Sequence, residues 1–142
     1  MENMTRVSFS VPFVKGKARP RFSKGRAYTP KGTKDAERQI ESAYRHACRD
    51  AFGALQTASE GVPVLIEIWT TRNVLSGFRR RDGDSHDDLQ KPDADNIAKL
   101  VLDALNGVAY EDDSQVVGLF VAKGARVRGN KPTTRVHVHW RD

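Results

Sequence analysis

Residues 91–107, "KPDADNIAKLVLDALNG", place two aspartates directly before a long apolar pattern. The apolar positions recur at i, i+3, i+4, i+7, i+8 and i+11, which is the spacing of one helix face; they are Ile97, Leu100, Val101, Ala104, Leu105 and Val108. Asn106-Gly107 can end a helix in a left-handed turn. The stretch predicts a helix that begins near Asp95 or Asn96 and buries one face against the rest of the chain.

A second helix and four strands are predicted around this one. Residues 33–55 repeat the same apolar spacing at Ile40, Ala43, Tyr44, Ala47, Cys48 and Ala51. Alternating or β-branched runs predict strands in "RVSFSVP" (6–12), "VPVLIEIWTT" (62–71), "QVVGLFVAK" (115–123) and "TTRVHVHW" (133–140). The order βαβαββ indicates an α+β fold, a small mixed sheet of about four strands packed against two main helices.

A length of 142 residues predicts a single domain over residues 1–142. The chain has no long uncharged apolar run and no export-signal pattern at its beginning, so we expect a soluble cytoplasmic protein without membrane contact. Cys48 is the only cysteine, which excludes an internal disulfide and a cysteine-built metal site. We expect Cys48 to be a small core residue.

Positive charge is concentrated near the amino terminus. The net charge is +6, and residues 1–34 contain nine Lys or Arg against Glu2 alone. Most of these cations fall in a Gly- and Pro-rich segment, about 12–32, which predicts a basic surface loop. Because cations that neutralise phosphates release counterions, nucleic acid is the expected partner, and the candidate DNA-binding residues are Lys15, Lys17, Arg19, Arg21, Lys24 and Arg26. Phe22 and Tyr28 would either stack on bases or anchor the loop.

Residues 72–90, "RNVLSGFRRRDGDSHDDLQ", have dense mixed charge and little periodicity, so they predict a mobile charged loop. Their aspartates, Asp82, Asp84, Asp87 and Asp88, lack the Gly and terminal Glu of a calcium-binding loop. We expect this loop to be solvated.

The acidic residues on both sides of the predicted helix 91–107 suggest metal chemistry. Asp93 and Asp95 precede it, and Glu111, Asp112 and Asp113 follow it before the next strand. A tight return from helix to strand would bring these groups to one edge of the sheet, where Mg²⁺ could take one or two carboxylates. Lys99, one turn after Asp95, could then assist phosphodiester hydrolysis. Alternatively, Asp95 and Asn96 only cap the helix, and Lys99 pairs with Asp103 on its surface.

The motifs "PDADNIAKLVLDAL" and "YEDDSQVV" resemble those of the RusA family of Holliday junction resolvases, and "KGKARPRF" with "AYTP" is similar to the amino-terminal part of phage-type members. The resemblance implies that Asp93, Asp95 and Asp113 bind catalytic Mg²⁺, for which Mn²⁺ would substitute, with Lys99 essential and Asp112 a secondary ligand. It also implies a RusA-like homodimer that resolves four-way junctions by paired nicks, in DNA recombination and repair in a bacterial cytoplasm. The 79–90 loop departs from the family pattern.

Two other classes stay open at this point. A general metal-dependent nuclease would use the same acids without preferring junctions. A DNA-binding module without catalysis would need the basic loop but not the clustered acids, which repel phosphate unless a metal intervenes.

Overall fold

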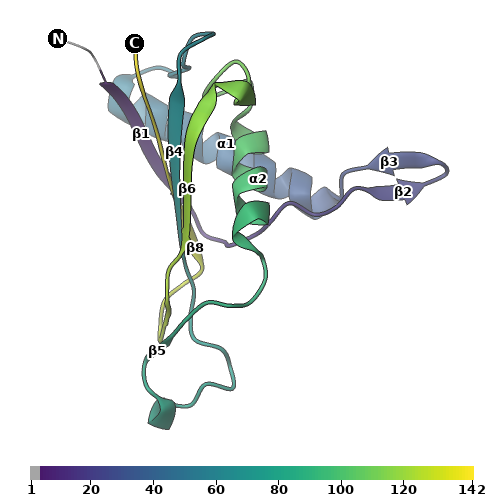
Figure 1. The fold of residues 1–142 in the computed structure, drawn as a ribbon, viewed down its shortest axis with the longest axis vertical. Coiled ribbons are helices and arrows are strands. Elements are labelled where there is room, and N and C mark those ends of the chain that lie inside the picture. The colour runs from purple at the N-terminus through teal and green to yellow at the C-terminus, as the bar shows by residue number, and fades with distance from the viewer. Residues whose placement is uncertain (1–3) are drawn as a thin grey trace.

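The computed structural model describes residues 4–142 as a four-stranded sheet with two helices (Figure 1). The strands are β1 (Met4–Val11), β8 (Thr133–Arg141), β4 (Val64–Thr71) and β6 (Val116–Lys123), in that order across the sheet. Strand β8 is antiparallel to both β1 and β4, whereas β4 and β6 are parallel. The predicted α+β class with a mixed four-stranded sheet is confirmed.

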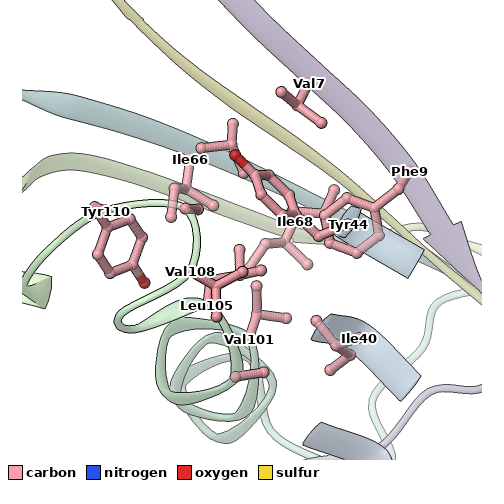
Figure 2. Packing of buried hydrophobic residues seen from close by; sticks show 14 of the residues in the cluster. Val7, Phe9, Ile40, Tyr44, Ile66, Ile68, Val101, Leu105, Val108 and Tyr110 are labelled. Atoms are coloured by element: carbon pink, nitrogen blue, oxygen red, sulfur yellow. The ribbon is translucent and has the colours of Figure 1, made fainter. Parts of the chain in front are cut away.

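The two helices are α1 (Lys31–Phe52) and α2 (Ala94–Leu105). All six apolar positions predicted for the second helix are buried. In α1 the buried stripe runs through Ile40, Tyr44 and Cys48 but ends there, because Ala51 is exposed. Figure 2 shows Tyr44 beside Phe9 of β1, with their rings edge to face at 5.9 Å. The helices and the sheet therefore share one apolar core.

One face of the sheet packs on the helices, and the other face is open. In β4 the residues Val64, Ile66 and Ile68 are buried, while Leu65 and Trp69 are exposed, as the alternation predicts. Trp69 contacts Phe120 of β6, with ring centroids 5.1 Å apart. Strand β6 is an edge of this sheet.

The two segments that were predicted as loops, 12–32 and 72–90, contain short strands and a 3₁₀ turn. The basic segment 12–32 contains a hairpin of β2 (Arg21–Ser23) and β3 (Arg26–Tyr28), which extends away from the rest of the molecule (Figure 1). The charged segment 72–90 contains the 3₁₀ turn η1 (Arg80–Asp82) and β5 (Ser85–His86), and β5 pairs with β7 (Arg126–Val127). A second 3₁₀ turn, η2 (Asp113–Gln115), precedes β6.

Neither α1 nor any other helix in residues 4–142 has the length and apolar character needed to cross a membrane.

Candidate functional site

Asp93 and Asp95 lie at the start of α2 with their side chains exposed. Asp93 is the N-cap residue, in an extended conformation with φ −70° and ψ 156°, yet its side chain makes no capping hydrogen bond. Asp95 and Asn96 lie inside the helix, so the alternative in which they cap it is wrong. Both carboxylates are therefore available to a ligand, and Lys99 is exposed one turn beyond Asp95.

The predicted surface pair between Lys99 and Asp103 does not form. Asp103 Oδ2 instead forms an ion pair with Lys17 Nζ at 3.1 Å, and Lys17 Nζ also pairs with Glu37 Oε1 of α1 at 2.6 Å. Burial alone would lower the pKa of Lys17, but these two carboxylates raise it above its usual value. Lys17 was predicted to bind DNA, and in the structure it joins the segment before the hairpin to both helices.

The second acidic group lies beyond the other end of α2. The helix is followed by Gly107, with φ 78°, and the chain folds back so that the Tyr110 hydroxyl donates to Leu102 O at 2.8 Å. Asp112 then caps η2, and its Oδ2 accepts from Ser114 N at 3.1 Å. Hydrogen bonding from the Ser114 side chain, together with this bond from the Ser114 backbone, lowers the pKa of Asp112. Asp113 is exposed and makes no such bond, so its carboxylate is the more available of the two.

The two acidic groups do not meet within one chain. Helix α2 has 12 residues and is thus about 18 Å long, with Asp93 at one end and Asp113 beyond the other. Among residues 4–142, no three His, Cys, Asp or Glu side chains lie close enough to hold one metal ion. The expectation that the helix-to-strand return would gather these acids at one edge is wrong, because β6 begins beside the far end of α2.

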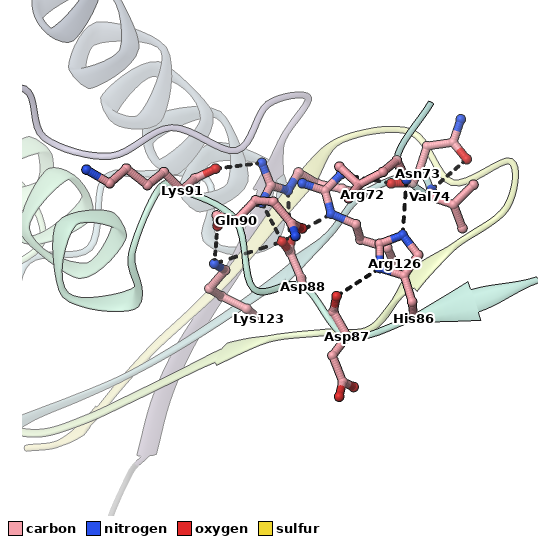
Figure 3. Close-up of polar contacts among 11 residues, drawn as sticks. Arg72, Asn73, Val74, His86, Asp87, Asp88, Gln90, Lys91, Lys123 and Arg126 are labelled. Atoms are coloured by element: carbon pink, nitrogen blue, oxygen red, sulfur yellow. Dashed lines mark hydrogen bonds and ion pairs between the residues drawn. The ribbon is translucent and has the colours of Figure 1, made fainter. Parts of the chain in front are cut away.

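A buried carboxylate anchors the chain that leads into Asp93 (Figure 3). The Asp88 side chain is fully buried, and it accepts hydrogen bonds from Arg72 Nε at 2.9 Å and Arg126 Nε at 3.1 Å, with Lys123 Nζ at 3.9 Å. Arg72 and Lys123 also donate to Gln90 O, and Arg72 donates to Lys91 O at 3.0 Å. Three cations thus fix residues 88–91, directly before the acidic pair.

Asp88 corrects the prediction of a solvated 72–90 loop. Burial alone would raise its pKa, but hydrogen bonding from Arg72 and the charges of Arg72, Arg126 and Lys123 hold it below the usual range. Asp87, its neighbour, is exposed. Local sequence does not show which of the two aspartates is buried, because the partners of Asp88 lie 16, 35 and 38 residues away in the chain.

The basic segment passes directly over the start of α2. Lys17 N donates to Asn96 O at 2.9 Å. A Cβ atom on Gly16 would lie 2.9 Å from the side chains of Asn96 and Pro92, so only glycine allows this close approach. The segment that leads into the hairpin therefore crosses the start of α2, next to Asp93 and Asp95.

The other predicted DNA-binding residues lie before and after this crossing in the chain. Lys15, Arg19, Lys24 and Arg26 are exposed. Arg21 begins β2, and its side chain lies outside those that the structure describes. Phe22 has an exposed fraction of 79%, so it does not anchor the hairpin to the core.

The donor set at the start of α2 fits Mg²⁺. Hard cations prefer carboxylate oxygens, and Mg²⁺ usually takes one or two of them and keeps water or phosphate oxygens in its remaining positions. Asp93 and Asp95 supply two carboxylates that have no competing hydrogen-bond donor or ion pair within residues 4–142.

Comparisons with known proteins show which family the chain matches. A family model described as endodeoxyribonuclease RusA matches residues 12–139. An uncharacterized protein, YqaN of Bacillus subtilis (strain 168), is 64% identical over 33 residues, a stretch that covers 23% of each chain.

Proposed function

Because the chain belongs to the RusA endodeoxyribonuclease family, we propose that it is a Mg²⁺-dependent endonuclease that cuts four-way DNA junctions by paired nicks, in recombination and repair. The observation that supports this most is the exposed, uncapped pair Asp93 and Asp95 beside the basic segment that leads into the hairpin. A free DNA-binding module has no use for two carboxylates next to its phosphate-binding surface.

The residues at the start of α2 would have different roles in the reaction. Asp93 and Asp95 would hold the metal, which when bound supplies Lewis-acid stabilisation of the phosphate and lowers the pKa of a water. Lys99, on the same side of the helix as Asp95, would bind the scissile phosphate and favour the negative charge that develops there. The Asp88 cluster would keep residues 88–91, and hence Asp93, in place.

We further propose that the third metal ligand, Asp113, comes from the partner subunit of a homodimer. In a two-fold dimer every contact occurs twice. If one region of the first chain touches a different region of the second chain, the same two regions also meet with the chains exchanged. If the Asp93 end of one α2 meets the Asp113 end of the other chain, two equivalent sites form at once. The symmetry of a four-way junction also calls for two matched sites.

The edge strand β6 offers a surface for this dimer. Its end lies near Asp93, because Lys123 contacts Gln90 O, whereas its beginning directly follows Asp113 and η2. Val117, Leu119 and Phe120 are exposed along it, and an uncovered edge strand can pair with another chain. Antiparallel pairing of two β6 strands would bring the start of each beside the end of the other, and so Asp113 toward the partner's Asp93.

The hairpin and its approaches should bind phosphate. Replacing Arg19, Lys24 and Arg26 together by Ala should weaken junction binding, and the slope of log affinity against log salt should fall by about one unit for each phosphate that is no longer neutralised. Fluorescence anisotropy across a salt series measures this slope.

A matched control removes the same charge elsewhere. Replacing Arg38, Arg45 and Arg49 of α1 by Ala should leave the slope nearly unchanged. An equal decrease in both triple variants would show that the hairpin has no special part in binding.

Substrate preference separates the proposal from its alternatives. The protein should cut a four-way junction in Mg²⁺ much faster than a linear duplex of the same sequence. Equal cutting of both would indicate a general metal-dependent nuclease, and tight binding without cutting would indicate a non-catalytic module.

A further inference from the structure

The hairpin of β2 and β3 has two different faces. Phe22 pairs with Ala27, so these two residues share one face, while Arg26 and Tyr28 lie on the other. Its tip is a two-residue turn in which Lys24 and Gly25 both have positive φ, 51° and 74°. The hairpin is thus a narrow arm with an aromatic ring on one face and cations at its tip and on the opposite face.

Nothing in the described part of the chain covers the Phe22 ring. Its exposed fraction of 79% is the second largest among the large apolar residues, and the arm extends away from the body (Figure 1). A two-stranded ribbon gains little stability by itself in water. An exposed ring on such an arm, with cations at the tip and on the opposite face, suits a partner that offers both phosphates and flat apolar surfaces.

We propose that this arm enters the branch point of the DNA junction and that Phe22 stacks on a base there, an inference that rests on the proposed function. In a linear duplex every base is already stacked on its neighbours, and separating them is costly. At a branch point the stack is interrupted, so less free energy is needed to expose a base face. Stacking on aromatic rings is also tolerant of sequence.

The position of the arm supports this role. Its base crosses the start of α2, where Lys17 N donates to Asn96 O, between the two proposed metal ligands and Lys99. The arm therefore starts beside the proposed metal ligands and carries Phe22 outward from the body, so a base held by Phe22 would lie farther along the DNA than the phosphate to be cut (Figure 1). The arm would link recognition of a branch point to placement of the adjacent strand at the metal.

A fluorescent base at the branch point tests the proposal. A junction with 2-aminopurine at one of the central positions is titrated in EDTA, which withholds the metal and keeps the DNA intact. The wild-type protein should raise the emission as the base loses its neighbours, and Phe22→Ala should abolish the rise and weaken binding roughly tenfold. Phe22→Trp should restore both.

Two controls make the result specific. Ser23→Ala, in the same strand, should behave as the wild type, and the probe in a linear duplex should show no rise. An unchanged rise with Phe22→Ala, or an equal rise in the duplex, would overturn the inference. Junction cutting in Mg²⁺ without any fluorescence change would refute the arm's role alone, whereas a Phe22-dependent rise without cutting would refute the nuclease proposal alone.

Discussion

Replacing Asp93, Asp95 or Asp113 singly by Asn is expected to abolish Mg²⁺-dependent cutting of a four-way junction while junction binding persists. Each change keeps the size of the side chain but removes a negative ligand for the metal. Metal-ion catalysis contributes several kcal/mol to such a reaction, so the rate should fall about 100-fold or more. Binding depends on the cations and should be equal or stronger. Single-turnover cleavage and anisotropy on the same junction measure the two quantities.

Asp50→Asn is the matched control, because this exposed carboxylate lies on α1 and, among residues 4–142, pairs only with His46. It should cut normally. Asp112→Asn should have a smaller effect than Asp113→Asn, since Asp112 already accepts a hydrogen bond from Ser114 N. Near-normal cutting by any of the three main variants would show that its aspartate does not bind the metal.

Among the aspartates of segment 72–90, replacing the buried Asp88 by Asn should give the largest loss of folding stability. The change leaves Arg72 and Arg126 in a buried site without the charge that they surround. Removing one partner of a buried ion pair typically costs about 3–5 kcal/mol. Because the same cluster fixes Gln90 and Lys91, cutting should also decrease in the fraction that remains folded. Urea unfolding measures the free energy of unfolding.

Asp87→Asn is the neighbouring control and should change stability little, since Asp87 is exposed. The lowered pKa of Asp88 also predicts a pH dependence. Its stabilising contribution is complete above the unfolded-state pKa, about 3.9, and is lost as the pH falls through the lower folded-state value. The wild type should therefore lose stability in this acidic range more steeply than Asp88→Asn; equal slopes would contradict the assigned role.

The main elements could be predicted because each has a strong local pattern. The apolar stripe from Ile97 to Leu105 of α2 is buried, as is Val108 in the turn after it, and the alternation of Val64, Ile66 and Ile68 with Leu65 and Trp69 fixes the two faces of β4. Helix α2 ends at Leu105 because Asn106 is extended, with φ −63° and ψ 126°, and Gly107 follows in a left-handed conformation with φ 78° that glycine adopts readily. The spacing of apolar residues was sufficient to predict these elements, because the residues that it places on one face are the residues that are buried.

The hairpin and the Asp88 cluster could not be predicted in the same way. The strands β2 and β3 have only three residues each, too few for an alternation to be recognised. Asp88 is buried only because Arg72, Lys123 and Arg126 come from other strands and their ends. Lys17 likewise resembles its neighbouring cations in sequence, and only the approach of Glu37 and Asp103 distinguishes it.

The candidate site was predicted residue by residue but not in its arrangement. Asp93, Asp95 and Lys99 lie together and exposed at the start of α2, but Asp113 lies beyond its other end. The short connection from Leu105 to Val116 places Asp113 beside the carboxyl end of α2, one helix length from Asp93. The separation therefore follows from the order of the elements, and the prediction of a single acidic cluster did not take the length of the helix into account.

Mixing Asp95→Asn chains with Asp113→Asn chains tests the central claim, a metal site shared between two chains. In a mixed dimer one site contains both substitutions, while the other combines the intact Asp95 of one chain with the intact Asp113 of its partner. The account predicts that each variant alone is inactive and that co-refolded mixtures recover nicking, at roughly a quarter of the wild-type level, since half of the dimers are mixed and each has one site. A mixture as inactive as its components would contradict the account.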